Sequence, residues 1–72
     1  MSIRVMDIRR RLAANIIRLR KEQGWSQDEL AARAGLHRTY ISGVERCVRN
    51  PTITVVSKIA VALEVSEAVL LG

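Results

Sequence analysis

The stretch SQDELAARAGLHRTYISGVE, which runs from Ser26 to Glu45, decides the fold of this chain. Ser26 stands three residues before Glu29, which is the spacing of a capping box, where a hydroxyl and a carboxylate satisfy backbone N–H groups of a first helical turn. A helix should therefore begin at Gln27. Gly35 then ends that helix, because glycine adopts the left-handed conformation without a Cβ clash.

Apolar residues recur at helical spacing on both sides of this glycine. The first stripe comprises Leu30, Ala31 and Ala34, and the second comprises Ile41 and Val44. Ala31 is necessarily small, since a larger side chain there would hold the two helices apart. The segment predicts two short helices, over about residues 27–33 and 38–46, joined by a tight turn. The other faces of the second helix carry Arg38, Thr39, Ser42 and Gly43.

Helical patterns also flank this segment. A longer helix is expected from Asp7 to about Gln23, with Gly24 stopping it and a buried stripe formed by Ile8, Leu12, Ile16 and Leu19. Thr52 is expected to cap a fourth helix that runs to about Leu63 and presents to the core Ile53, Val56, Ile59, Ala60 and Leu63. Ser66 is placed to cap a short last helix, Glu67–Leu71. The pattern predicts an all-α fold of five helices in a single domain, residues 1–72.

The composition favours a small basic domain. The 72 residues include no Phe, one Trp and one Tyr, so the core must be aliphatic, and Trp25 takes an apolar core position. The formal net charge of +5 favours a polyanionic partner. Basicity alone leaves nucleic acid and an anionic membrane surface as alternatives.

Several classes of protein do not fit the sequence. No signal peptide or membrane-spanning segment is expected, because charged residues interrupt the apolar positions near the start, namely Arg4, Arg9, Arg10 and Arg11. A cytoplasmic location without a membrane partner follows. One histidine, one cysteine, and no glycine-rich phosphate loop or carboxylate cluster argue against an enzyme, a metal site, a cofactor and a small-molecule substrate. Cys47 is interpreted as a small, half-buried residue rather than a redox sensor.

The central segment resembles a known family. The run Gln27, Ala31, Gly35, Ile41 and Val44, spaced by four, four, six and three residues, is similar to the Cro/cI-type helix-turn-helix family, also called the lambda-repressor-like or XRE family. The resemblance covers roughly residues 12 to 71, and RTYISGVER with RNPT is most similar to controller proteins of restriction–modification systems. It implies a lambda-repressor-like fold with its helix-turn-helix core at residues 26–46, and a function in transcription regulation.

The resemblance implies which residues read base pairs. Arg38 and Thr39 match family positions whose side chains meet base edges in the major groove, and arginine suits the paired acceptors of guanine. The alternative for Arg38 is a solvated arginine on an exposed face. Tyr40 either contacts a thymine methyl or covers the edge of the preceding helix, and Ser42 is included in the base-contacting set.

A second set is expected to contact phosphates. Gln27 matches the family's phosphate-binding glutamine, at a helix start where the dipole also favours an anion. The other candidates are Ser26, His37, Arg46, Arg49 and Asn50. The alternative is a solvated rim around a small domain, and for His37 a turn histidine in water. The consecutive residues Arg9, Arg10 and Arg11 point around their helix and are interpreted as general surface charge.

Three further positions carry structural expectations. Arg20 and Glu45 match a family ion pair that joins the first helix to the end of the third. Gly43 lies inside a predicted helix, where glycine costs about 1 kcal/mol relative to alanine. Two explanations remain for it: base reading shifts toward residues 38 to 40, or glycine permits close approach to the sugar-phosphate backbone.

The C-terminal end predicts dimerisation. It offers more apolar surface than one short helix can bury, through Val61, Val65, Val69, Leu70 and Leu71. A homodimer that binds a palindromic operator on double-stranded DNA is therefore the leading hypothesis, as a repressor or controller protein. The alternatives are an antitoxin, a phage-type repressor, or a protein-interaction module that uses the same fold.

Overall fold

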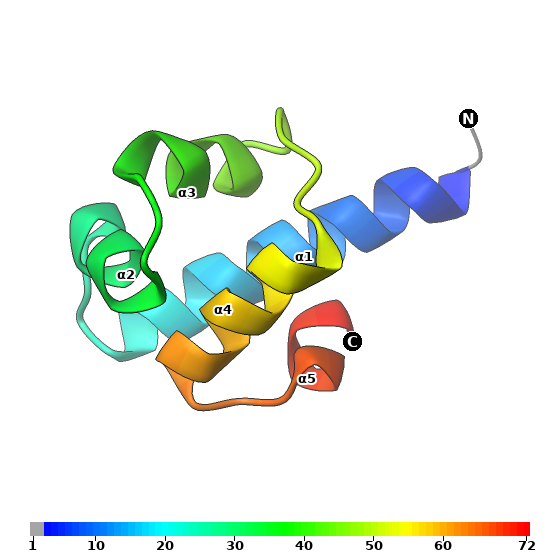
Figure 1. Cartoon of the computed structure of the whole chain (residues 1–72). Helices are drawn as coiled ribbons and strands as arrows, with labels where there is room; N and C mark the ends of the chain where they lie inside the picture. The colour runs from blue at the N-terminus through cyan, green and yellow to red at the C-terminus, as the bar shows by residue number, and fades with distance from the viewer. Residues whose placement is uncertain (1–2) are drawn as a thin grey trace.

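Five helices make up the part of the chain that the structure describes. The structure is a computed structural model, and it describes the backbone of residues 3–72 and the side chains of residues 8–72. The helices are α1 (Ile3–Glu22), α2 (Gln27–Ala34), α3 (Arg38–Glu45), α4 (Ile53–Leu63) and α5 (Glu67–Leu71). Figure 1 shows α3 above and α4 below, with α2 at one end and α1 running behind. The predicted all-α class with five helices is confirmed.

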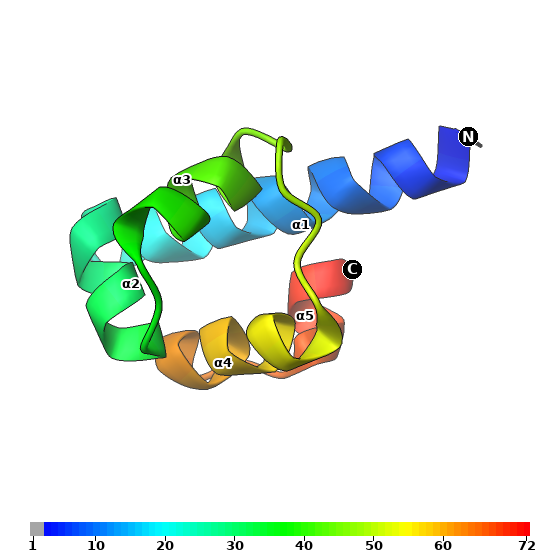
Figure 2. The same ribbon diagram turned by 45° about the horizontal axis from the view of Figure 1, so that its top comes forward.

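The packing explains how the bundle exposes α3. Contacts join α2 to both α3 and α4, and join α1 to α3 and α5. Turning the molecule shows that α3 and α4 lie on different sides of the bundle and that the N-terminal end of α1 extends past the other helices (Figure 2). Among residues 3–72, no helix therefore lies over the outward side of α3.

Hydroxyl caps begin three of the helices where the sequence predicted them. Ser26 Oγ accepts a hydrogen bond from the Glu29 backbone N–H at 3.0 Å. Thr52 and Ser66 do the same for the backbone N–H groups three residues on, at 3.2 Å in each case. The Glu29 carboxylate instead accepts a hydrogen bond from Arg33 Nε at 2.8 Å. The second half of the predicted capping box, in which this carboxylate would bind the backbone N–H at the helix start, is therefore not formed.

The core is aliphatic, as the composition indicated. The fully buried large side chains come from all five helices and are Ile16, Leu30, Ile41, Ile59 and Leu70. Two residues assigned to the buried stripes are exposed, because each lies near the N-terminal end of the packed part of its helix: Ile8 is 44% exposed and Ile53 is 86% exposed. Both line a surface hollow of about 300 Å³ that α1, α4 and α5 share.

The predicted start of the first helix is wrong. We expected α1 to begin near Asp7, but it begins at Ile3. The residues before Asp7 contain neither glycine nor proline, and nothing in them interrupts a helix that later turns have already nucleated. The expected end is close to the observed one, since Gly24 follows with a φ of 74°.

The last helix is tied to the first by its backbone. Asn15 Nδ2 donates hydrogen bonds to the carbonyl oxygens of Leu70 at 2.8 Å and Val69 at 3.3 Å, and Arg11 Nε donates to that of Leu71 at 3.4 Å. These bonds satisfy carbonyls that the end of a helix leaves unpaired. Leu70 is fully buried beneath this anchor, so its assignment to an exposed dimer surface is wrong.

A buried ion pair fixes three helices relative to one another. Arg20 Nε and Nη2 lie 2.7 and 3.0 Å from the two carboxylate oxygens of Glu45, and Arg20 Nη1 donates to the Trp25 carbonyl at 2.9 Å. The side chains of Arg20 and Glu45 are 12% and 4% exposed. Gln27 Nε2 donates a further bond to Glu45 at 2.8 Å. The pair therefore connects α1, the start of α2 and the end of α3.

No helix among residues 3–72 combines the length and the apolar character that crossing a bilayer would require.

Replacing Glu45 by alanine should destabilise the domain strongly. The substitution leaves the Arg20 guanidinium buried without its carboxylate, which costs about 3 to 5 kcal/mol at a deeply buried pair. Thermal unfolding followed by circular dichroism would measure the change. Glu22→Ala is the matched control, because it breaks an ion pair with Arg18 whose side chains are more than half exposed, worth about 0 to 1 kcal/mol. Equal melting temperatures for Glu45→Ala and the wild type would contradict this expectation.

Candidate nucleic-acid interface

A glycine turn sets the angle between α2 and α3. Gly35 has φ 69° and ψ 36°, in the left-handed region, and its N–H points to the carbonyls of Ala31 and Ala32. The Leu36 N–H then bonds to the Ala31 carbonyl at 2.9 Å. Ala31 is 2% exposed and belongs to the core where α2 meets α3 and α4. This local geometry joins two helices of eight residues each into a rigid unit.

The N-terminal end of α3 points outward. Ile41 and Val44 are buried, at 0% and 2% exposure, and they fix the inward face of the helix. Arg38 and Thr39, in the first turn of the helix, are exposed. Arg38 Nε lies 3.7 Å from Asp28 Oδ1, and both side chains are mostly in solvent, at 65% and 73% exposure. An exposed pair at this distance is weak, so Arg38 exchanges it readily for another acceptor.

Tyr40 is half-buried and packs against the core. Its ring also carries a contact that sequence reasoning missed: the Arg49 guanidinium carbon lies 5.1 Å from the ring centroid. Arg49 belongs to the loop between α3 and α4, and no local pattern in the sequence indicates this approach. Ser42 is half-buried on the same helix.

Gln27 has a partner within the protein. Its side chain is half-buried and its amide donates to Glu45 Oε1 at 2.8 Å. One amide N–H is thus held by the buried carboxylate at the start of α2. An amide nitrogen carries two N–H donors, so a second remains for another acceptor. Gln27 and Glu45 are 18 residues apart, so no local pattern in the sequence indicates this bond.

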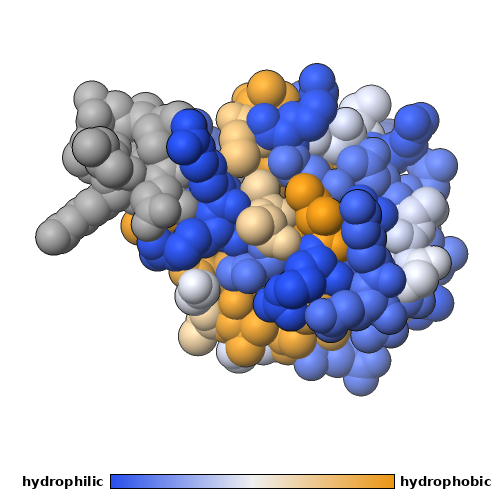
Figure 3. Space-filling model, turned by 180° about the vertical axis from the view of Figure 1, so that it is seen from behind, coloured by the Kyte–Doolittle hydropathy of each residue, from blue (hydrophilic) through white to orange (hydrophobic). Residues whose placement is uncertain are grey.

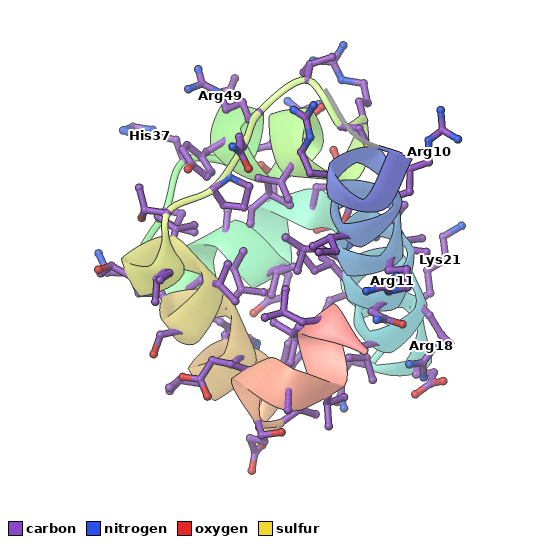
Figure 4. All side chains as sticks on the ribbon, turned by 90° about the vertical axis from the view of Figure 1, so that its right-hand side faces the viewer. Arg10, Arg11, Arg18, Lys21, His37 and Arg49 are labelled. Atoms are coloured by element: carbon purple, nitrogen blue, oxygen red, sulfur yellow. The ribbon has the colours of Figure 1, made fainter. Side chains whose placement is uncertain are left out.

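The remaining candidates surround α3 without deep burial. His37 is the residue that precedes α3, makes no side-chain capping bond and is exposed. Ser26, Arg46 and Asn50 are exposed as well. Figure 4 shows His37 and Arg49 projecting away from the body on the side of α3. In the same view Arg10, Arg11, Arg18 and Lys21 are spread along α1, which agrees with general surface charge rather than one binding site.

The candidate dimer surface lies on the other side of the molecule. Among its members, Val61 is 71% exposed, Val69 is 44% exposed and Leu71 is 39% exposed. Val65 is partly buried against the core. Seen from behind, the broadest group of apolar side chains lies along the lower part of the molecule, with smaller groups at the top and near the centre (Figure 3). Of the described residues, Val48 is 65% exposed in the loop after α3, and the other large apolar residues that are exposed belong to α1, α4 and α5.

Comparison with known proteins agrees with this geometry. The profile of the helix-turn-helix family HTH_3 matches residues 16–70. The crystal structure of a hypothetical transcription factor, NHTF, from Neisseria is 45% identical in sequence to this chain, with a TM-score of 0.89, and the match covers 93% of this chain and 77% of that one.

Two other solved structures are of regulators whose roles are named. The restriction–modification controller protein C.AhdI from Aeromonas hydrophila is 35% identical, with a TM-score of 0.83, over 86% of this chain and 94% of that one. The biofilm master regulator SinR, solved in complex with DNA, is 39% identical, with a TM-score of 0.80, over 85% of this chain and 98% of that one. This chain therefore belongs to the helix-turn-helix family HTH_3 and is a transcriptional regulator of the XRE type, related to restriction–modification controller proteins and to SinR.

Proposed function

We propose that this chain binds double-stranded DNA sequence-specifically as a homodimer on a palindromic operator, with α3 of each subunit in the major groove. The observation that carries the proposal is the outward projection of Arg38 and Thr39 from the first turn of α3. The N-terminal residues of a recognition helix are the ones that meet base edges in this geometry. The similar protein SinR was solved in complex with DNA, which supports DNA binding by this chain.

In this proposal, side chains in the first turn of α3 make the main contacts with base edges. Arg38 donates two hydrogen bonds to the O6 and N7 acceptors of a guanine, after leaving its weak pair with Asp28. Thr39 contacts the neighbouring base, and Tyr40 and Ser42 complete the base-contacting set. The exposed pair with Asp28 is weak, so it opposes this exchange only slightly.

Phosphate contacts orient the domain on the duplex. Gln27 presents its second amide N–H at the start of α2, where unpaired backbone N–H groups and the helix dipole attract an anion. The other phosphate contacts are assigned to Ser26, His37, Arg46, Arg49 and Asn50, of which His37 and Arg49 project on the α3 side of the molecule (Figure 4). The protein then acts in the cytoplasm, where DNA is accessible, and without catalysis.

Removing the base-reading pair should abolish specific binding. The double variant Arg38→Ala/Thr39→Ala is expected to bind operator DNA at least about tenfold more weakly, since each good base contact is worth about 1 to 3 kcal/mol. Gel shifts with a duplex that the wild-type protein selects from a random library would measure the loss. Arg18→Ala is the charge-matched control, because Arg18 lies away from α3 (Figure 4).

Two further results bear on the same experiment. Wild-type affinity should fall with salt, with a log–log slope of about −0.9 for each phosphate neutralised. If the wild type binds all duplexes weakly and the double variant binds equally well, the protein-interaction hypothesis replaces DNA reading.

Dimerisation should depend on the apolar surface of α4 and α5. Val69→Glu places a charge on an exposed apolar position of α5, so it should convert a dimer at micromolar concentration into a monomer without unfolding it. Sedimentation velocity would measure the change. Val48→Glu is the control, because Val48 is 65% exposed but belongs to the loop after α3. A wild-type protein that sediments as a monomer would contradict the proposed homodimer.

The likeness to C.AhdI supports a finer proposal about the genes under control. The operator then precedes the genes of a restriction–modification system, including the gene for this chain. A protection footprint on the DNA upstream of that gene would show two half-sites about 34 Å apart on one face of the duplex. Absence of protection there would restrict the proposal to DNA binding in general.

A further inference from the structure

Gly43 lies in the middle of α3 and is buried by a side chain from outside the helix. A Cβ built at this position would lie 2.8 Å from Cγ of Arg49, 3.1 Å from its Cδ and 3.3 Å from its Nε. Cβ atoms essentially never approach carbon that closely, so any larger residue at position 43 would displace the Arg49 side chain. The absence of a side chain at position 43 therefore lets another group approach α3 closely. In this chain that group is the aliphatic part, or stem, of the Arg49 side chain.

The backbone of the loop brings Arg49 to this place. Cys47 follows α3 with a φ of 61°, and the chain turns back so that the N–H groups of Val48 and Arg49 both point to the Gly43 carbonyl, at 2.9 and 3.1 Å. The Val48 bond and the bond from the Cys47 N–H to the Val44 carbonyl at 3.1 Å together form the hydrogen-bond pattern that reverses a chain at a helix end, and the Arg49 bond extends it. Cys47 is half-buried and its thiol lies 3.8 Å from the Arg9 carbonyl, which seats the turn against α1.

The charged end of Arg49 rests on the outward side of α3. Its guanidinium stands over the Tyr40 ring at 5.1 Å, within the range of a cation–π contact. Arg49 is exposed as a whole, and it projects on the α3 side of the molecule together with His37 (Figure 4). The stem is thus held by packing on Gly43 while the cation remains available to an anion.

We propose that Gly43 is a positioning residue, whose missing side chain lets Arg49 lie across α3 so that Tyr40 holds its guanidinium ready for a DNA phosphate. This inference rests on the proposed function. A preset arginine loses little rotamer freedom when it binds, because its stem is already ordered in the unbound protein. The recognition surface is then a composite of helix residues and one loop residue.

A mutant cycle on operator affinity tests this proposal. Arg49→Ala should weaken binding about tenfold, the usual size of one charge-assisted hydrogen bond, and should make the log–log salt slope shallower by about 0.9. Gly43→Ala should weaken binding by a similar factor because its Cβ displaces Arg49. In the Arg49→Ala background, Gly43→Ala should have no additional effect. The probe is the duplex that the wild-type protein selects from a random library.

A second cycle with Arg46 separates positioning from a general effect on the helix. Arg46 is exposed, and the three atoms nearest to a Cβ at position 43 all belong to Arg49, so Gly43→Ala should weaken binding equally with and without Arg46. The melting temperature of Gly43→Ala should be unchanged or higher than that of the wild type, since alanine is the better helix former. A loss of affinity without a loss of stability is not expected from a merely structural glycine.

The outcomes are distinct. If Gly43→Ala binds like the wild type while Arg49→Ala is weakened, or if the two effects multiply, Gly43 does not position Arg49 and the inference is overturned while the proposed function stands. If the wild type selects no duplex, the proposed function and this inference fail together.

Discussion

The carboxylate of Glu45 is the group on which the arrangement of the first three helices depends. It lies at the last residue of α3 and accepts hydrogen bonds from Arg20 on α1 and Gln27 at the start of α2. With its side chain 4% exposed, the charge is tolerated only while those donors remain. One buried anion thus fixes the C-terminal end of α3 against two other helices, and the opposite end of α3 is left to project into solvent.

The surface of α3 also depends on two chain reversals. Gly35 sets α3 against α2 before the helix, and Cys47 turns the chain back over α3 after it, each with a left-handed backbone. The second reversal brings Arg49 over Gly43 and Tyr40. A residue that follows α3 in sequence therefore becomes part of the outer surface of the helix. A contact surface defined by the residues of α3 alone would omit the Arg49 guanidinium.

Local features of the fold were predictable because they involve neighbours along the chain. A hydroxyl cap reaches a backbone N–H three residues away, so Ser26, Thr52 and Ser66 identified three helix starts. The start of α1 was missed because a capping residue such as Asp7 permits a helix start without requiring one. The burial of Leu70 was missed because it depends on α1, whose Asn15 holds the α5 backbone from 55 residues away.

The sequence by itself determined the five-helix fold, the helix-turn-helix at its centre, and the outward direction of Arg38 and Thr39, because helical period and glycine turns act within a few residues. Only the tertiary structure decided which polar side chains near α3 already have partners within the protein. Gln27 is held by Glu45, and Arg49 lies over Gly43 and Tyr40. Such partners come from different elements, and distances between elements follow from how the core packs rather than from spacing along the chain.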